Sequence, residues 1–173
     1  MQENNNLLIV GAGEYGKLVK EIVVETNFYN KIEFIDDVAS NVLGKVSDLQ
    51  KYVGEFRFAT VAIGNSVVRM ALIDKLKHFG YEIATVLHPK SYISNSAKIG
   101  KGCLIEPFAV VQTGAEICDG CLISAGAIVG HNAIVNEGCH IDIGAVVPQR
   151  SVVIKNTKVS ARPVYCGENE NNV

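Results

Sequence analysis

The feature that most constrains this chain is an aliphatic residue that recurs every six positions through its second half. The series begins at Leu87 and continues without a miss to Val159. A small residue (Ala, Ser, Thr or Cys) lies two positions before each member of the series. An amphipathic helix or a heptad seam cannot keep a period of six, whereas short strands joined by turns at fixed intervals can. The pattern therefore predicts a solenoid of hexapeptide strands.

Three such strands make one coil of a triangular prism, and the aliphatic residues point toward its axis. Residues eighteen positions apart then stack on one another. Ile99, Ile117, Val135 and Val153 are predicted to form one inner column. Many glycines of this segment fall between the strands, where the chain must turn sharply and a Cβ is unfavourable.

The cysteines allow two interpretations. Cys118 and Cys121 form a C-x-x-C motif, but a zinc site needs a second ligand pair at matching spacing, and the chain offers none. Cys103, Cys121 and Cys139 are eighteen residues apart and occupy the small-residue position of the repeat. This spacing favours a ladder of small buried side chains.

The first part of the chain has a different rhythm, and we predict three regions. Residues 1–84 form a small Rossmann-like α/β domain with a parallel sheet, residues 85–162 form the β-helix, and residues 163–173 form a polar tail. Strands are predicted at residues 7–10, 31–37 and 59–64, and helices at residues 17–25 and 66–79. Leu18, Val19, Ile22 and Val23 are expected on the buried face of the first helix. Val68, Leu72, Leu76 and Phe79 lie along the second, which is expected to end at Gly80.

A glycine motif joins the first strand to the first helix. Gly11, Gly13 and Gly16 form G-x-G-x-x-G, and Asp36 follows the last glycine by twenty residues. Such glycines let phosphate approach a helix N-terminus, and the acid can hold a ribose hydroxyl. The same turn also occurs as a plain packing device. A full dinucleotide domain needs two mononucleotide-binding halves. Because this chain has room for about one, we expect a single nucleotide joined to another group.

The charge balance excludes some partners. Sixteen basic and eighteen acidic residues give a net charge of −2, with no run of Lys or Arg. We therefore expect no nucleic-acid partner and no membrane insertion. The start MQENNNLLIV lacks the basic region and long apolar core of a signal peptide, which predicts a cytoplasmic protein.

Five blocks of sequence, in this order, resemble the bacterial hexapeptide-repeat acyltransferases that acetylate nucleotide-linked amino sugars and sialic acids. The blocks are LLIVGAGEYGK, EFIDD, VAIGNSVVR, LHPKSYIS and IVGHNAIVNEGCHIDIGA. The resemblance implies a left-handed β-helix, a homotrimer with sites between subunits, and acetyl-CoA as co-substrate without a metal. It also implies a UDP-amino sugar or related sugar as acceptor, acetylated on an amino or hydroxyl group by direct transfer.

The resemblance also assigns residues. His131 matches the general base, a task that suits imidazole because it titrates near neutral pH. Asn132 occupies the position where the family usually has Glu or Asp, and an amide offers no charge to an imidazolium. The substrate-binding residues implied are Gly13, Glu14, Tyr15, Asp36, Asp37, Gly64 and Asn65. The cofactor-binding residues implied are His140, Gly144 and Gln149.

Three other functions fit parts of the sequence. A γ-class carbonic anhydrase would need three zinc-binding histidines, two of them five residues apart, a spacing not found here. An NAD oxidoreductase would bind NADH without competition from a UDP-sugar. A catalytically weak or inactive trimeric nucleotide-sugar-binding protein with a truncated β-helix is the strongest rival, because of Asn132 and because the repeat ends at Val159.

Overall fold

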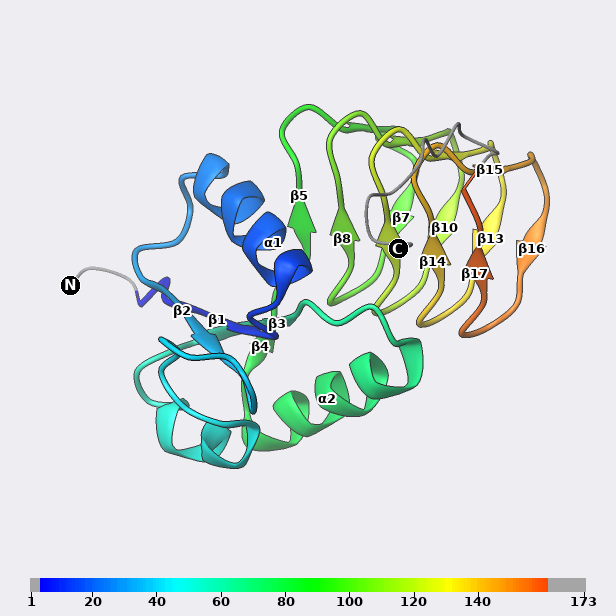
Figure 1. Ribbon diagram of the computed structural model, residues 1–173. Helices are drawn as coiled ribbons and strands as arrows, with labels where there is room; N and C mark the ends of the chain where they lie inside the picture. The colour runs from blue at the N-terminus through cyan, green and yellow to red at the C-terminus, as the bar shows by residue number, and fades with distance from the viewer. Residues whose placement is uncertain (1–3, 162–173) are drawn as a thin grey trace, which may run out of the picture.

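The computed structural model describes residues 4–161 and contains an α/β part followed by a prism of stacked strands (Figure 1). All four strands of the α/β sheet are parallel, in the order β2-β1-β3-β4. Their bounds are β1 (Leu7–Val10), β2 (Ile32–Ile35), β3 (Phe58–Val61) and β4 (Glu82–Ile83). The chain leaves β1 for β2 on one side and returns to place β3 on the other, which makes a topological switch point beside β1.

The helices cover opposite faces of this sheet. Helix α1 (Glu14–Glu25) lies on one face and α2 (Ser66–Phe79) on the other, where the 3₁₀ helix η1 (Val46–Tyr52) also packs (Figure 1). Alternate residues of β1 enter the two cores: Leu7 and Ile9 pack with α1, and Leu8 and Val10 with α2. Alternation along a strand with both faces covered accounts for the continuous apolar run LLIV.

The prism has three faces, each a sheet of parallel strands, which we call the docked face, the apolar face and the third face. The docked face contains β5 (Val86–Leu87), β8 (Leu104–Ile105), β11 (Leu122–Ile123), β14 (His140–Ile141) and β17 (Lys158–Val159). The apolar face contains β6 (Tyr92–Ile93), β9 (Val110–Val111), β12 (Ile128–Val129) and β15 (Val146–Val147). The third face contains β7 (Lys98–Ile99), β10 (Glu116–Ile117), β13 (Ile134–Val135) and β16 (Val152–Val153).

The interior of the prism follows the period of six. The predicted inner column is confirmed, because Ile99, Ile117, Val135 and Val153 pair in register along the third face. The cysteine ladder is also present: Cys103, Cys121 and Cys139 are fully buried in the prism core with free thiols. At the corners, every sixth residue from position 102 to position 156 has a positive φ, so each turn places one residue in the left-handed region.

The α/β part packs on the docked face. Outward side chains of the first three strands there, Val86, Leu104 and Leu122, share a buried core with α1. Helix α2 approaches one corner of the prism so closely that a Cβ on Gly120 would lie 2.4 Å from the Met70 sulfur. These contacts explain why that corner carries glycine.

The predicted fold class is confirmed: an α/β domain with a parallel sheet precedes the stacked parallel strands of a hexapeptide-repeat β-helix. The chain changes from the sheet to the prism between Ile83 and Val86. The predicted division at residues 84 and 85 stays a prediction. The predicted tail, residues 163–173, lies outside the described residues.

The buried faces of the two helices differ in part from the apolar spacing of the sequence. In α2 the buried residues are Arg69, Ile73 and Leu76, whereas Val68 is 45% exposed. The reason is that this helix packs against the prism as well as the sheet, which rotates the contact surface toward Arg69. In α1, Leu18 is 38% exposed, and the other three predicted residues are buried as expected.

Candidate functional site

A pocket of about 260 Å³ opens at the carboxyl end of the α/β sheet. Its polar end is formed by Gly11, Asp36 and Asp37, at the ends of β1 and β2. Its apolar wall includes Val68 and Leu72 from α2; Val68 is 45% exposed, whereas Leu72 is partly buried against the core beneath the helix. An apolar slot with acids at its mouth, at a switch point of a parallel sheet, is suited to a nucleoside.

The three glycines of the loop have different roles. Gly11 has φ +107, and a Cβ there would meet the Ala62 carbonyl oxygen at 2.7 Å. A Cβ on Gly16 would meet the Gly11 carbonyl oxygen at 2.0 Å, so this glycine packs the helix against the loop. A Cβ on Gly13 would have no atom within 4 Å. Only Gly13 therefore leaves open space, as expected where a ligand approaches the loop.

The two acids are tied to the backbone. Asp36 accepts hydrogen bonds from the N–H groups of Ala12 at 2.8 Å, Val38 at 2.8 Å and Ala39 at 2.9 Å. These N–H groups, Ala12 first, lower the pKa of Asp36. Asp37 accepts from the N–H of Val46 at 2.9 Å. Asp36 thus holds the glycine loop in place at the edge of the pocket that it lines.

The helix N-termini at this edge differ. Helix α2 is capped by Asn65, whose Oδ1 accepts the Val68 N–H at 3.0 Å. Helix α1 begins after Gly13 with no side-chain cap, and Glu14 lies exposed in its first turn. Uncapped N–H groups at a helix N-terminus attract anions. The next residue, Tyr15, turns inward, and its buried hydroxyl has no hydrogen-bond partner among residues 4–161.

The predicted base lies in a different part of the molecule. His131 is exposed at the corner between the apolar face and the third face, and lines a pocket of about 410 Å³. The other lining residues are Tyr92, Val110, Gln112, Thr113 and Asn132. The His131 N–H donates to Gln112 Oε1 at 3.0 Å, and His131 Nδ1 lies 3.2 Å from Asn132 Nδ2. The His131 ring is therefore open to solvent, and its Nδ1 lies beside the Asn132 amide.

Asn132 occupies the left-handed position of its turn. Its φ is 56°, and its Oδ1 lies over Gly114 of the preceding coil. Asn156 has the same conformation over Gly138. Asn and Asp are the residues after Gly that tolerate this region best. The positive φ of this position therefore restricts which side chains it accepts, whatever their part in catalysis.

The second histidine is held by its own chain. His140 points outward from β14 on the docked face, with 17% of its side chain exposed. Its Nε2 lies 3.0 Å from Ser124 Oγ and 3.8 Å from Asp142 Oδ1. Burial lowers the pKa of His140, with Lys158 and Arg69 adding to the effect and Asp142 opposing it.

The structure separates the predicted cofactor-binding residues. Gln149 lies one coil beyond His131 on the same corner, where its N–H is close to Gly130. Gly144 lies in the turn between β14 and β15, on the corner nearest His140, and its N–H donates to the Ala125 carbonyl at 3.0 Å. Since the corner with His131 lies opposite the docked face, one subunit does not bring the two histidines together.

Arg69 was not singled out from the sequence, because it reads as a polar residue on a helix surface. It is fully buried, and its guanidinium donates to four carbonyls at 2.7–2.8 Å. Two belong to Ile63 and Gly64 of the loop after β3, and two to Gly120 and Gly138 of the prism. Arg69 therefore ties the edge of the nucleotide pocket to the β-helix. No spacing in the sequence signals this contact.

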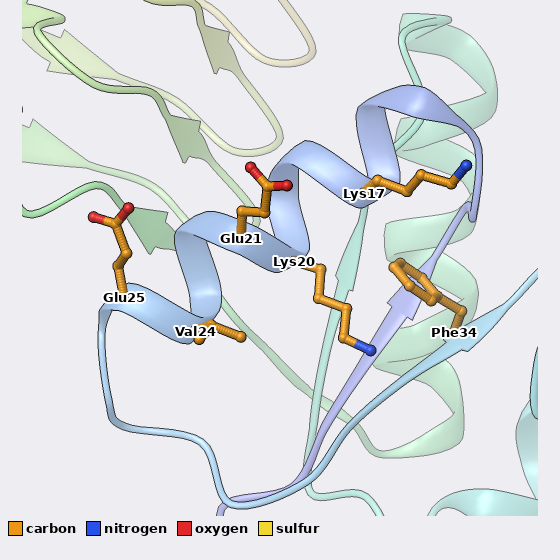
Figure 2. A pocket seen from close by; sticks show the side chains of 6 residues that line it. All are labelled: Lys17, Lys20, Glu21, Val24, Glu25 and Phe34. Carbon is orange, nitrogen blue, oxygen red and sulfur yellow. The ribbon is translucent and has the colours of Figure 1, made fainter.

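A further groove, of about 660 Å³, runs along the outer side of α1. Figure 2 shows Lys17 and Lys20 on the side of the helix toward Phe34, whereas Glu21 and Glu25 point away from Phe34. Lys20 Nζ lies 5.1 Å from the centre of the Phe34 ring. The groove contains none of the predicted site residues, and its mixed charges are typical of a solvated helix face.

Residues 4–161 contain neither a metal-binding cluster nor a membrane-spanning helix. No group of three or more His, Cys, Asp and Glu side chains is arranged to hold a metal ion. None of the helices in this range combines the length and the apolar composition needed to cross a membrane.

Both parts of the chain are similar to known protein families. Residues 6–76 match the PglD N-terminal domain family, and residues 96–131 match the bacterial transferase hexapeptide family, which consists of six repeats. UDP-N-acetylbacillosamine N-acetyltransferase of Bacillus subtilis (strain 168) is 28% identical over 110 residues, covering 58% of this chain and 50% of the relative. GDP-perosamine N-acetyltransferase of Escherichia coli O157:H7 is 30% identical over 117 residues, with the same coverage. The chain thus spans about half the length of these curated relatives.

Solved structures extend the similarity. The acetyltransferase domain of PglB from Neisseria gonorrhoeae FA1090, in complex with acetyl coenzyme A, superposes with a TM-score of 0.87 at 28% identity. The match covers 92% of this chain and 80% of that one. PerB from Caulobacter crescentus, in complex with CoA and GDP-perosamine, gives a TM-score of 0.62 at 20% identity, covering 90% and 91%. The second likeness concerns the fold alone.

Proposed function

We propose that this chain, which combines a PglD N-terminal domain with bacterial transferase hexapeptide repeats, is an acetyl-CoA-dependent N-acetyltransferase acting on an amino sugar carried by a nucleotide. The observation that carries the proposal is the coexistence of two sites: a nucleoside-sized pocket at the switch point and an exposed histidine in a second pocket on the β-helix. The curated relatives are N-acetyltransferases named for UDP- and GDP-linked sugars, and the PglB domain was solved with acetyl coenzyme A.

On the acceptor side, the nucleoside would occupy the slot between Asp36, Asp37 and the α2 wall. Its diphosphate would lie at the uncapped N-terminus of α1, beside the open Gly13. The loop containing Gly64 and Asn65, held by Arg69 and by the α2 cap, would border the sugar. Glu14, exposed in the same first turn, would contact the ligand from the solvent side.

At the β-helix, His131 is the proposed general base. Its Nε2 takes a proton as the sugar amine attacks the thioester carbonyl, the C–S bond breaks, and the same proton returns to the departing thiolate. This step needs a free Nε2 lone pair. When the Asn132 amide nitrogen donates to Nδ1, the ring proton resides on Nε2. Rotating the amide by 180° lets Oδ1 accept Nδ1–H, and we assign this second arrangement to the reacting enzyme.

We propose a homotrimer with its sites between subunits. The outward residues of the apolar face, Tyr92, Val110, Ile128 and Val146, form an unbroken apolar ladder that borders the His131 pocket. A neighbouring subunit packed there would bring its docked face, with His140 and Gly144, toward this His131, and Gln149 would extend the same groove. We also propose a cytoplasmic location, because acetyl-CoA is the proposed co-substrate. Sedimentation equilibrium should give three times the 18.6 kDa of the chain.

The decisive experiment measures release of CoA thiol from acetyl-CoA in the presence of UDP- and GDP-linked amino sugars, with sialic acids as hydroxyl acceptors. We expect turnover with a nucleotide-linked amine and its loss in His131→Ala. Equal rates in the two proteins would remove His131 from the mechanism.

The Asn132 amide facing Nδ1 favours one alternative, a catalytically weak or inactive nucleotide-sugar-binding protein. It predicts calorimetric binding of the nucleotide sugar without thiol release from any acceptor.

A further inference from the structure

The pocket at the His131 corner contains a side-chain amide that the proposed mechanism leaves without a role. Gln112 follows β9, lies nineteen residues before His131, and lines the same pocket of about 410 Å³. At the equivalent positions of the neighbouring coils, eighteen residues away on either side, the chain has Ser94 and Gly130. The long amide of Gln112 is therefore particular to the coil that adjoins the proposed base.

A hydrogen bond to the backbone orients this amide. The His131 N–H donates to Gln112 Oε1 at 3.0 Å. A backbone N–H can only donate, so the amide atom that faces it must be the oxygen and not the nitrogen. The nitrogen, Nε2, carries two protons, and no acceptor within residues 4–161 takes either of them. Gln112 therefore offers an unused N–H donor in the pocket of the base.

A donor in this pocket suits one stage of acyl transfer. As the sugar amine attacks the thioester, a C–N bond forms and the π electrons of the carbonyl move to its oxygen. This oxyanion is stabilised most by a donor that is already in place, because no reorganisation is then needed. When the oxyanion collapses, the carbonyl forms again, the C–S bond breaks, and His131 passes the amine proton to the thiolate.

We propose that Gln112 is a catalytic residue of this transfer, whose Nε2–H donates to the thioester carbonyl oxygen and stabilises the oxyanion. The inference rests on the proposed acetyltransferase activity. An amide N–H is neutral and keeps its proton, so it stabilises the negative charge without a proton transfer that would compete with His131.

Three other side chains that line the pocket carry donors. The Asn132 amide lies 3.2 Å from His131 Nδ1 and is engaged with the ring. Thr113 is exposed, and Tyr92 is 62% exposed. Of these four side chains, only Gln112 is hydrogen-bonded to the backbone of the base residue. Its donor is therefore the one whose position is coupled to that of the base.

The test separates the oxygen of this amide from its nitrogen. Gln112→Glu is isosteric and keeps an oxygen for the His131 N–H, but a carboxylate donates nothing and repels an oxyanion. Gln112→Met removes both groups. We expect kcat for thiol release to fall by about 10²–10³-fold in both variants, the usual effect of losing one oxyanion donor. The KM for acetyl-CoA should change little, because the donor acts on charge that develops in the transition state.

Ser96→Ala is the matched control. The Ser96 Oγ accepts the Gly114 N–H at 3.1 Å across one coil at the same corner, but Ser96 does not line the pocket. Its loss should leave kcat unchanged. If Gln112 only supports the turn, Gln112→Glu will be as active as wild type, and this result would overturn the proposal. A loss in Thr113→Val beside an active Gln112→Glu would assign the donor to Thr113 instead.

A second measurement does not depend on turnover. In ¹H–¹⁵N spectra, the side-chain amide signal of Gln112 is identified by its absence from Gln112→Glu. It should shift when acetyl-CoA is added and not when CoA is added, because CoA lacks the carbonyl. The amide of Gln50, exposed on η1, is the internal control.

The same response to acetyl-CoA and CoA, or no response to either, would overturn the inference. A protein that shows the shift yet releases no thiol refutes the proposed function alone. An active protein whose Gln112→Glu variant is equally active refutes this inference alone.

Discussion

The two histidines of the β-helix occupy opposite kinds of environment. His131 is exposed at a corner, and its Nδ1 lies 3.2 Å from Asn132 Nδ2. His140 is largely covered, with its Nε2 held by Ser124 and faced by Asp142. The repeat places them differently: His140 lies on a strand beside the inward Ile141, whereas His131 lies in the turn two residues after the inward Val129. The His131 ring is thus open to a substrate, whereas the His140 ring is preorganised by its own chain.

The largest expected effect concerns the exposed ring. His131→Ala should lower kcat by about 10²–10⁴-fold, the usual contribution of a general base, with little change in unfolding free energy because the side chain is exposed. Stopped-flow thiol release and urea unfolding measure the two quantities. His78→Ala, on the exposed side of α2, is the matched control and should leave both unchanged. A large loss of stability in His131→Ala would show that this corner is structural.

The next prediction concerns Arg69, which is buried between the α/β domain and the prism. Arg69→Met should destabilise the protein by at least about 3 kcal/mol, because four carbonyls lose their donor in the interior. Urea unfolding followed by circular dichroism measures this difference. Lys77→Met removes an exposed cation from the same helix, paired with Asp119, and should cost less than about 1 kcal/mol. Similar losses in the two variants would mean that Arg69 does not hold the domains together.

The third prediction, Asn132→Asp, changes the side chain beside the exposed His131 ring. A carboxylate accepts only, so it holds the ring proton of His131 on Nδ1 and frees Nε2, and Asp tolerates the positive φ of this turn. We expect kcat to rise up to about tenfold. Asn132→Gly keeps the turn and removes the side-chain contact, so it should not share the gain. A slower Asn132→Asp enzyme would contradict the proposed role of the ring.

The smallest effect is the pH dependence carried by the covered ring. Burial lowers the pKa of His140 in the folded protein, so the unfolded chain takes up the proton first as the pH falls. The stability that this residue contributes is complete above the unfolded pKa of about 6.5 and is lost as the pH falls below it. His140→Gln should therefore lose less stability than wild type between pH 7 and pH 5 in urea titrations. Parallel stability curves would contradict this sign.

Much of the fold could be predicted from residue spacing. The period of six identifies which residues stack, and the register of Ile99 with Ile117 follows from it. The glycine loop and the acid after β2 place the nucleotide pocket, where Gly11 and Asp36 do meet. Such patterns are readable because they repeat, or because they depend on a local backbone requirement such as the φ of Gly11.

The site was less accessible to sequence reasoning. Gln149 and His140 could be assigned together from a family resemblance, but the structure places them on different sides of the prism. Arg69 and Glu106 escaped notice because a charged residue in a sequence is expected to be solvated. Arg69 is buried by contacts with segments about fifty or more residues away, and Glu106 is only 4% exposed at a corner of the prism.

The sequence by itself determined the prism, its inward columns and the glycine loop, because each follows from interactions between a residue and its neighbours along the chain or one coil away. Only the tertiary structure decided which face of the prism the α/β domain covers. That choice converts Val86, Leu104 and Leu122 from outward residues into core, buries Arg69 among carbonyls, and leaves His131 open. The physical reason is that docking is set by the fit of two surfaces, and no period in the sequence records which surfaces meet.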